Sequence, residues 1–145
     1  MNRRRGLDPL AIGLLILAVL LVGCGGPANG PALKDTQWVL ATLGGEAPPA
    51  GTAPSAVFSA DEVSGSAGCN TYFGAYAVDG SEITIGDVAS TEMWCMEPAG
   101  VMDQEQAFLA ALRSAAGYRL SGAQLEILDA TDRVILTFEP RPASP

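Results

Sequence analysis

Three side chains in the sequence could carry unusual chemistry: the thiols of Cys69 and Cys95 and the carboxyl group of Glu105. The thiols are 26 positions apart and do not form a Cys-x-x-Cys redox motif. They could act as a reactive thiol or switchable disulfide, or form a structural disulfide that stabilises the fold by about 3 kcal/mol. We expect the structural disulfide if the chain is exported, because oxidising compartments preserve such bonds. Gly65 and Gly68 would let the backbone before Cys69 approach a neighbouring strand closely.

Glu105 is unusual because of its position in a predicted helix over residues 98–116. On a helical wheel it lies in the middle of the apolar arc, between Leu109 and Leu112. An unpaired carboxylate is costly to bury there. We therefore predict a buried structural acid that accepts hydrogen bonds from backbone N–H groups or from a hydroxyl such as that of Thr91. The alternative is an acid with a perturbed pKa in a ligand cavity.

Catalytic and metal chemistry finds little support in the composition. The sequence has no histidine, which excludes Ser-His-Asp and Cys-His nucleophile systems and most zinc and iron sites. Carboxylate pairs for glycoside hydrolysis stay open, although solvated acidic faces explain these residues more simply. We expect no catalytic residue, no metal site and no cofactor, and a hydrolase is the third of three functions considered.

The N-terminal segment indicates export. Arg3, Arg4 and Arg5 precede an apolar run of 13 residues from Leu10 to Val22, which is shorter than the ~20 that a membrane span needs and typical of a signal peptide. The stretch from Leu21 to Cys24 resembles the lipobox of bacterial lipoproteins. That resemblance implies cleavage after Gly23, a lipidated Cys24 and a flexible linker over residues 24–32; the alternative is an uncleaved anchor helix.

The charge balance limits the possible partners. The chain has 8 basic and 16 acidic residues, a net charge of −8. Without residues 1–23, which hold three Arg and one Asp, the net charge is −10. A domain with this much negative charge repels nucleic acid and anionic lipid headgroups. We therefore expect no nucleic-acid partner.

The elements that must position these side chains are mostly strands. Alternation of apolar residues and turn signals predict about seven or eight strands joined by short connections, which indicate antiparallel pairing. With the single helix, this predicts a mainly β (β-rich α+β) fold: an antiparallel curved sheet or open barrel with one amphipathic helix packed on it. The predicted strands cover residues 35–45, 56–60, 62–66, 71–78, 81–86, 87–95, 118–128 (split around Ser121-Gly122) and 133–140.

Aromatic residues allow two interpretations. Trp38, Tyr72, Tyr76 and Trp94 could line a pocket for one apolar ligand, as in other small β-barrels. The simpler interpretation places them in the core, because a domain of this size needs its large side chains for packing.

Short motifs follow one another in a distinctive order: Leu33–Trp38, Val63–Gly65 leading to Gly68–Tyr72, Ser90–Thr91 with Met93 and Cys95, Glu105 with Phe108, Leu109 and Leu112, and Leu125–Leu128. In this order and spacing they resemble the META domain family of HslJ-like bacterial lipoproteins. The resemblance implies a lipocalin-like open barrel over residues 33–140, followed by a loose tail at 141–145. It also implies envelope proteins linked to stress or antibiotic tolerance, without enzymatic activity. Trp94 departs from the family pattern, where a small residue usually precedes the second cysteine.

Two functions follow as hypotheses. The first is an envelope lipoprotein that works through contacts with an unidentified envelope protein; the second is a barrel that binds a lipid or another small apolar ligand. In both, we expect a monomeric domain tethered to the membrane through Cys24. It would face the periplasm from the outer membrane, or stand on the outer face of the plasma membrane in a cell without an outer membrane.

Overall fold

The computed structural model describes residues 32–142. The predicted signal peptide, the lipidation of Cys24 and the linker up to residue 31 therefore lie outside the described residues. Within them the chain forms nine strands and one helix: β1 (Thr36–Leu43), β2 (Ser55–Phe58), β3 (Glu62–Ser66), β4 (Thr71–Asp79), β5 (Glu82–Ile85), β6 (Ala89–Ser90), α1 (Val101–Arg113), β7 (Gly117–Ser121), β8 (Gln124–Leu128) and β9 (Val134–Pro140).

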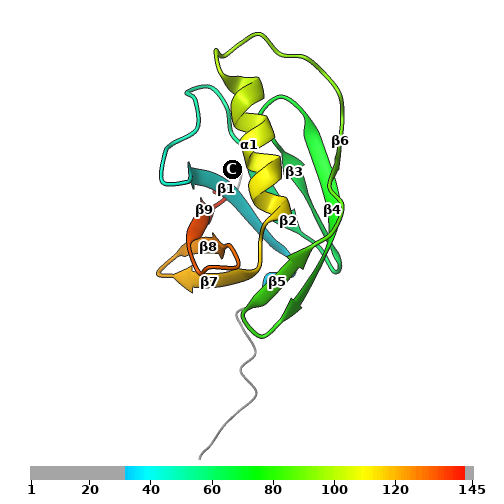
Figure 1. Cartoon of the computed structure of the whole chain (residues 1–145), viewed down its shortest axis with the longest axis vertical. Coiled ribbons are helices and arrows are strands. Elements are labelled where there is room, and N and C mark those ends of the chain that lie inside the picture. Colours follow the sequence, from blue (N-terminus) through cyan, green and yellow to red (C-terminus); the bar gives the residue numbers. More distant parts are fainter. Residues whose placement is uncertain (1–31, 143–145) are drawn as a thin grey trace, which may run out of the picture.

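The strands form one antiparallel sheet that closes into a ring (Figure 1). The order is β3-β2-β1-β9-β8-β7-β5-β4, and a further pairing of β3 with β4 completes the circle. Closure removes the unpaired edges that an open sheet would expose. The predicted mainly β fold, a curved antiparallel sheet with one helix against it, is therefore confirmed.

The remaining strand, β6, pairs with the same edge of β4 as β5 does. β4 pairs with β3 over Thr71–Ala75 and, on its other edge, with β6 at Tyr72 and Phe73. Further along, Tyr76–Asp79 pairs with β5. The register shifts by one residue between β5 and β6, so the chain follows β4 with a single irregularity around residues 86–88.

Alternating burial along β4 matches the predicted pattern. Tyr72, Gly74 and Tyr76 are buried, and the residues between them are exposed. Val78, which the alternation placed on the same face, is exposed because it lies near the end of the β4–β5 hairpin. The predicted strands 71–78 and 81–86 leave residues 79 and 80 for the turn, but Asp79 still pairs with Glu82, so the turn falls one residue later.

The helix is shorter than predicted by three residues at each end. Gly100 caps its N-terminus with φ of 83°, which is outside the helical region, so Pro98 to Gly100 lie before α1. At the other end Ala116 leaves the helix to join the sheet: its N–H donates to the Leu128 carbonyl at 2.8 Å. Among residues 32–142, no helix is long and apolar enough to cross a membrane.

The prediction of a strand over residues 87–95 is mostly wrong. Only Ala89 and Ser90 are in a strand, and residues 91–100 form an irregular loop before α1. This Trp94 loop (residues 91–100) lies at the upper end of the molecule in Figure 1. Its backbone bonds to β4 at Thr91, whose N–H donates to the Thr71 carbonyl at 3.0 Å, and to the side chain of Asn70 at Met93.

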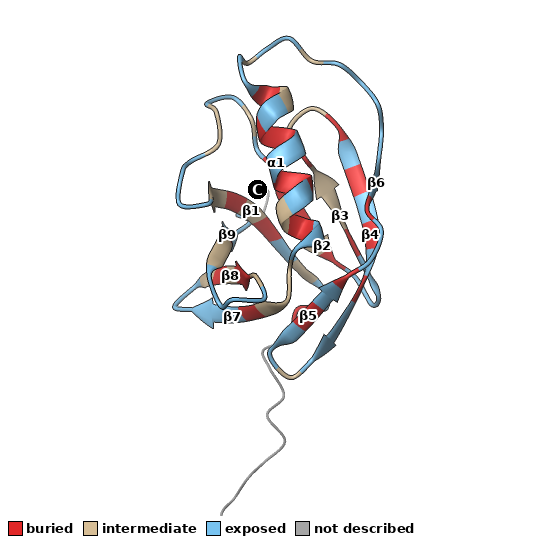
Figure 2. Cartoon of the chain, in the orientation of Figure 1, coloured by how far each residue is buried: buried red, intermediate tan, exposed pale blue. Residues whose placement is uncertain are grey.

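The core fills the ring between the sheet and α1. Phe108 of the helix contacts Tyr72 and Phe138 edge-on, with ring centroids 5.6 and 6.3 Å apart, and Phe58 meets Tyr76 at 5.0 Å. Figure 2 shows the buried stripe of α1 and the alternating buried bands of β4 and β5. The interior is thus occupied by large side chains. The bulkiest fully buried residues are Tyr72, Tyr118, Phe58, Phe108, Phe138, Leu33, Ile83, Leu112, Leu125, Ile127, Leu136 and Val63.

Candidate functional site

A disulfide fixes the Trp94 loop to the turn before β4. The structure joins Cys69 and Cys95, whose Cα atoms are 5.9 Å apart, as the sequence predicted. The two glycines before Cys69 approach other elements closely: a Cβ at Gly65 would overlap the carbonyl oxygen of Ser55 in β2, and one at Gly68 would lie 2.7 Å from Gln104 Oε1 of α1. Small residues before the first cysteine are therefore required by packing.

Glu105 lies directly beneath this turn and is 5 % exposed. Its Oε2 accepts hydrogen bonds from the backbone N–H groups of Cys69 at 3.0 Å and Asn70 at 2.6 Å. Its Oε1 accepts one from Asn70 Nδ2 at 2.6 Å. The predicted acceptance from backbone N–H groups is present, whereas the Thr91 hydroxyl bonds to Asn70 Oδ1 instead. The carboxylate is a structural acid with each oxygen bonded, which is the condition for burying such a group.

Asn70 connects Glu105 to the Trp94 loop and was not assigned a role from the sequence. It is 2 % exposed, and its side-chain amide pairs with both backbone polar groups of Met93. Oδ1 accepts from Met93 N at 2.7 Å, and Nδ2 donates to Met93 O at 3.0 Å. The Asn70 side chain thus makes the two hydrogen bonds to Met93 that a neighbouring strand would otherwise make. The sequence signal that could have indicated this role is the Gly68-Cys69-Asn70 turn, because Asn side chains in turns commonly bond backbone groups.

The Trp94 loop, fixed by the disulfide and by Asn70, exposes apolar side chains to solvent. Met93, Trp94 and Met96 are 57 %, 79 % and 82 % exposed, although three large apolar residues in four positions would usually be buried. The fourth residue, Cys95, is tied by the disulfide. The loop is therefore fixed from below and apolar on its outer surface.

Two grooves flank Trp94. One, of about 360 Å³, lies between Trp94 and one side of α1, where Met102, Gln106, Leu109 and Arg113 recur at helical spacing. Asp103 and the buried Glu105 also line it. The other, of about 280 Å³, lies between Trp94, Met96 and the start of α1. Trp94 forms a wall of both.

A family model for the META domain matches residues 31–142 of the chain. The chain belongs to the META domain family. Among curated proteins, none matches it.

Solved structures resemble this META domain in fold. A protein from Burkholderia xenovorans, determined by NMR, is 28 % identical, with a TM-score of 0.62, and the match covers 77 % of this chain and 85 % of that one. A DUF4847 family protein from Bacteroides vulgatus is 16 % identical, with a TM-score of 0.56, and the match covers 77 % and 96 %. The second likeness concerns the fold alone.

The other aromatic residues considered as ligand-lining lie inside the META domain. Trp38, Tyr72 and Tyr76 are buried, and the polar atom of each bonds within the chain. Tyr72 donates to the Ser55 carbonyl at 2.9 Å, and burial raises the pKa of its hydroxyl. The structure brings these three into the core and separates them from Trp94, which alone of the four is at the surface.

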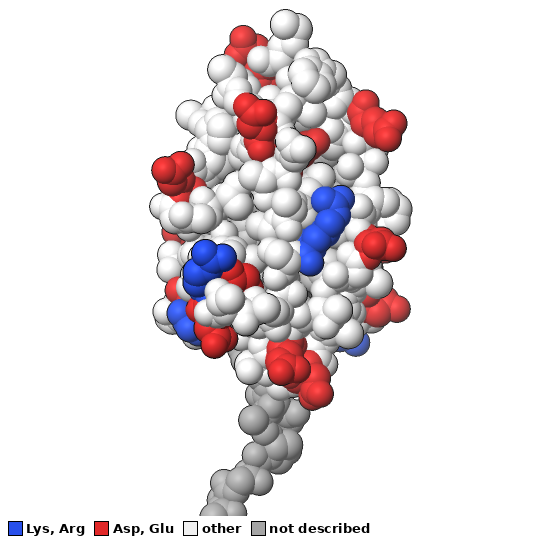
Figure 3. Space-filling view, viewed as in Figure 1, with Lys and Arg blue, Asp and Glu red and all other residues white. Residues whose placement is uncertain are grey.

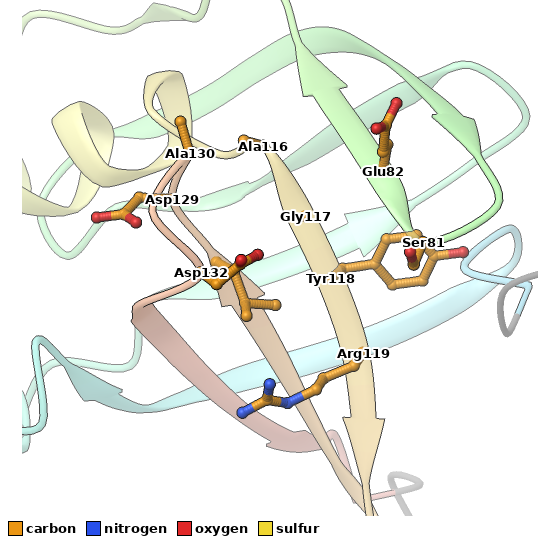
Figure 4. Close-up of a pocket in the computed structure, with 10 residues that line it drawn as sticks. Ser81, Glu82, Ala116, Gly117, Tyr118, Arg119, Asp129, Ala130 and Asp132 are labelled. Carbon is orange, nitrogen blue, oxygen red and sulfur yellow. The ribbon is translucent and has the colours of Figure 1, made fainter.

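A larger depression, of about 510 Å³, lies where β5 meets β7 and β8 (Figure 4). We call it the seam pocket; its lining residues include Glu82, Arg119, Asp129 and Asp132. In Figure 4 their charged groups point in different directions and do not converge on one point. Two of them are already paired: Arg119 with Glu126 at 2.6 Å, and Asp129 with Arg133 at 2.7 Å.

Hydrogen bonds hold Asp129 in its ionised form. The hydroxyl and N–H groups of Thr131 and the guanidinium and N–H of Arg133 all donate to it, and they lower its pKa below the ordinary value. These bonds organise the β8–β9 turn rather than a ligand site. Within the described residues, no group of three or more His, Cys, Asp or Glu side chains is placed to hold a metal ion.

Proposed function

We propose that this META domain is a non-enzymatic contact module of an exported lipoprotein, and that it binds a protein partner through the Trp94 loop and the adjoining groove. The observation that carries the proposal is Trp94: its side chain is 79 % exposed on a loop fixed by a disulfide and by Asn70. Exposed apolar surface on a rigid support is typical of interaction sites, and Trp is one of the residues enriched among interface hot spots.

The rigidity of the Trp94 loop supports a binding role for its exposed side chains. A fixed loop loses little conformational freedom on association, so more of the interaction energy appears as affinity. Met side chains adapt their shape to a partner, and all methionines of the chain except Met1 lie between residues 93 and 102. The filled interior, in contrast, disfavours a barrel that carries a lipid.

The cellular part of the proposal rests on the sequence and the family. The signal-peptide pattern and lipobox-like stretch support membrane attachment through Cys24, on the outer membrane where one is present. The META family supports a role in envelope stress or antibiotic tolerance. Replacing Cys24 with Ala should move the full-length protein from the membrane to the soluble or unprocessed fraction; unchanged membrane attachment with normal processing would contradict lipidation.

In-cell photo-crosslinking tests the contact surface. A photoreactive amino acid at position 96 of the full-length protein should give a discrete protein adduct that disappears in the Trp94→Ala variant. Position 73 is the matched control, because Phe73 is also an exposed large apolar residue, 56 % exposed, but lies on β4. Equal adducts from both positions, or adducts that survive Trp94→Ala, would refute the proposal.

A further inference from the structure

Acidic groups border the Trp94 loop. Asp103 lines both grooves, and Glu92 and Glu97 are exposed on either side of the apolar run from Met93 to Met96. In the upper part of Figure 3, where Figure 1 places this loop and the start of α1, Asp and Glu are visible and Lys and Arg are not. The apolar surface is therefore set in a negative potential.

The larger groove is not uniformly charged along its length. Its acids are the exposed Asp103 and the buried Glu105, whose oxygens already accept hydrogen bonds from Cys69 and Asn70. Arg113 also lines the groove, ten residues after Asp103 on α1, which is about 15 Å along the helix axis. Arg113 also donates to the Val88 carbonyl at 3.1 Å, so part of its guanidinium is already used within the chain. The attraction for cations is thus concentrated at the end of the groove next to Trp94.

We infer that the Trp94 loop recognises a short polypeptide segment in which an apolar side chain stands beside Lys or Arg residues. This inference rests on the proposed function and adds the chemistry of the partner. The apolar side chain packs against Trp94 and between the flexible side chains of Met96 and Met102. The cationic groups then face Asp103 and the neighbouring Glu97, which gives charge complementarity at the rim.

The same charges argue against two other occupants. An anionic membrane surface would be repelled by the acidic rim and by the net charge of −8. In a symmetric pair of two copies, each loop would meet the same acidic rim on the other copy, and like charges brought together across an interface are unfavourable. A basic segment is the occupant that satisfies both the apolar and the charged part of the surface.

Peptide selection tests the chemistry without knowledge of the natural partner. Full-length protein reconstituted in phosphatidylcholine nanodiscs is panned against a random 12-residue peptide library on phage, with the Trp94→Ala variant used for counter-selection. We expect the enriched peptides to combine an aromatic or aliphatic residue with at least two Lys or Arg residues. Their affinity should fall about tenfold or more in the Asp103→Lys/Glu97→Lys variant and also with added salt.

The matched control moves the same charges elsewhere. Asp61→Lys/Glu62→Lys changes two acids next to the exposed Phe73 and should leave the affinity within about twofold. Trp94-dependent peptides that are neutral or acidic, or that bind both charge variants equally, would overturn the inference and leave the contact surface standing. Trp94-dependent self-association of the protein would also overturn the inference, because the occupant would then be a second copy of the chain. Failure to enrich any Trp94-dependent peptide would overturn the contact surface itself.

Discussion

The Trp94 loop and the seam pocket lie at the two ends of the molecule, and their difference shows what makes a surface available for binding (Figure 1). The seam pocket is larger, about 510 Å³ against about 360 Å³ for the groove beside Trp94. Its charged groups, however, are used by neighbours in the same chain, as with Arg119 and Asp129. At the Trp94 loop the polar groups fix the backbone from inside and leave apolar side chains outside. We therefore base the proposed function on the exposed apolar side chains of the Trp94 loop and not on the size of the seam pocket.

The largest expected effect comes from removing the disulfide. The double variant Cys69→Ala/Cys95→Ala should lower the free energy of unfolding by about 3–4 kcal/mol, because the bond closes a loop of 26 residues in the unfolded chain. Urea denaturation measures the change, and reduction of the wild type should reproduce it. A loss below about 1 kcal/mol would mean that the loop is held mainly by Asn70 and Glu105.

The next largest effect concerns Glu105, whose carboxylate accepts hydrogen bonds from the turn before β4. Glu105→Gln should lower the free energy of unfolding by about 2 kcal/mol, because an amide offers one acceptor oxygen and turns an NH₂ group toward donors that now bond a carboxylate. Thermal unfolding measures the change. Gln106→Ala is the control: this exposed neighbour should give a change within about 0.5 kcal/mol. An unchanged melting temperature for Glu105→Gln would contradict a buried structural role.

A smaller effect separates stability from binding at the Trp94 loop. Trp94→Ala should change the free energy of unfolding by less than about 0.5 kcal/mol, since the side chain is 79 % exposed. It should also remove the tryptophan fluorescence that acrylamide quenches readily and leave the signal of buried Trp38. A marked loss of stability would show that Trp94 packs against the domain, and the contrast with the seam pocket would weaken.

The smallest effect belongs to the seam pocket and depends on pH. The pKa of Asp129 is lowered by its Thr131 and Arg133 hydrogen bonds, so the unfolded state binds a proton more readily than the folded state. The stability that Asp129 contributes is therefore present above the unfolded pKa near 3.8 and is lost as pH falls below it. The difference in stability between wild type and Asp129→Asn should be constant above about pH 5 and narrow in acid. A constant difference down to pH 2 would contradict this.

Much of the scaffold could be predicted because its signals are local. Alternation in β4 and β5 indicated which residues are buried, and the helical wheel placed Glu105 between Leu109 and Leu112 on the buried face of α1. The ends of elements were less accurate. The helix was predicted too long because the wheel cannot register that Gly100 adopts a positive φ or that Ala116 bonds to β8.

The candidate site could be predicted only in part. The cysteine pair and the buried acid followed from their number and spacing, but Asn70 was missed because its partners, Met93 and Glu105, are 23 and 35 positions away in the chain. Residues 87–95 have the composition of a strand. In the fold, however, the last backbone bond to β4 is made by Thr91, and Met93 bonds to the Asn70 side chain of the β3–β4 turn instead of to a strand.

The sequence by itself determined the mainly β fold, the identity of most core residues and the two thiols that pair, because periodicity and residue type act over short stretches. Only the tertiary structure decided that β3 meets β4 to close the ring and that Trp94 faces outward while Trp38 faces inward. A large apolar side chain favours burial wherever the fold offers space. At position 94 the disulfide and the Asn70 amide fix the backbone, so the indole projects away from a core that is already filled.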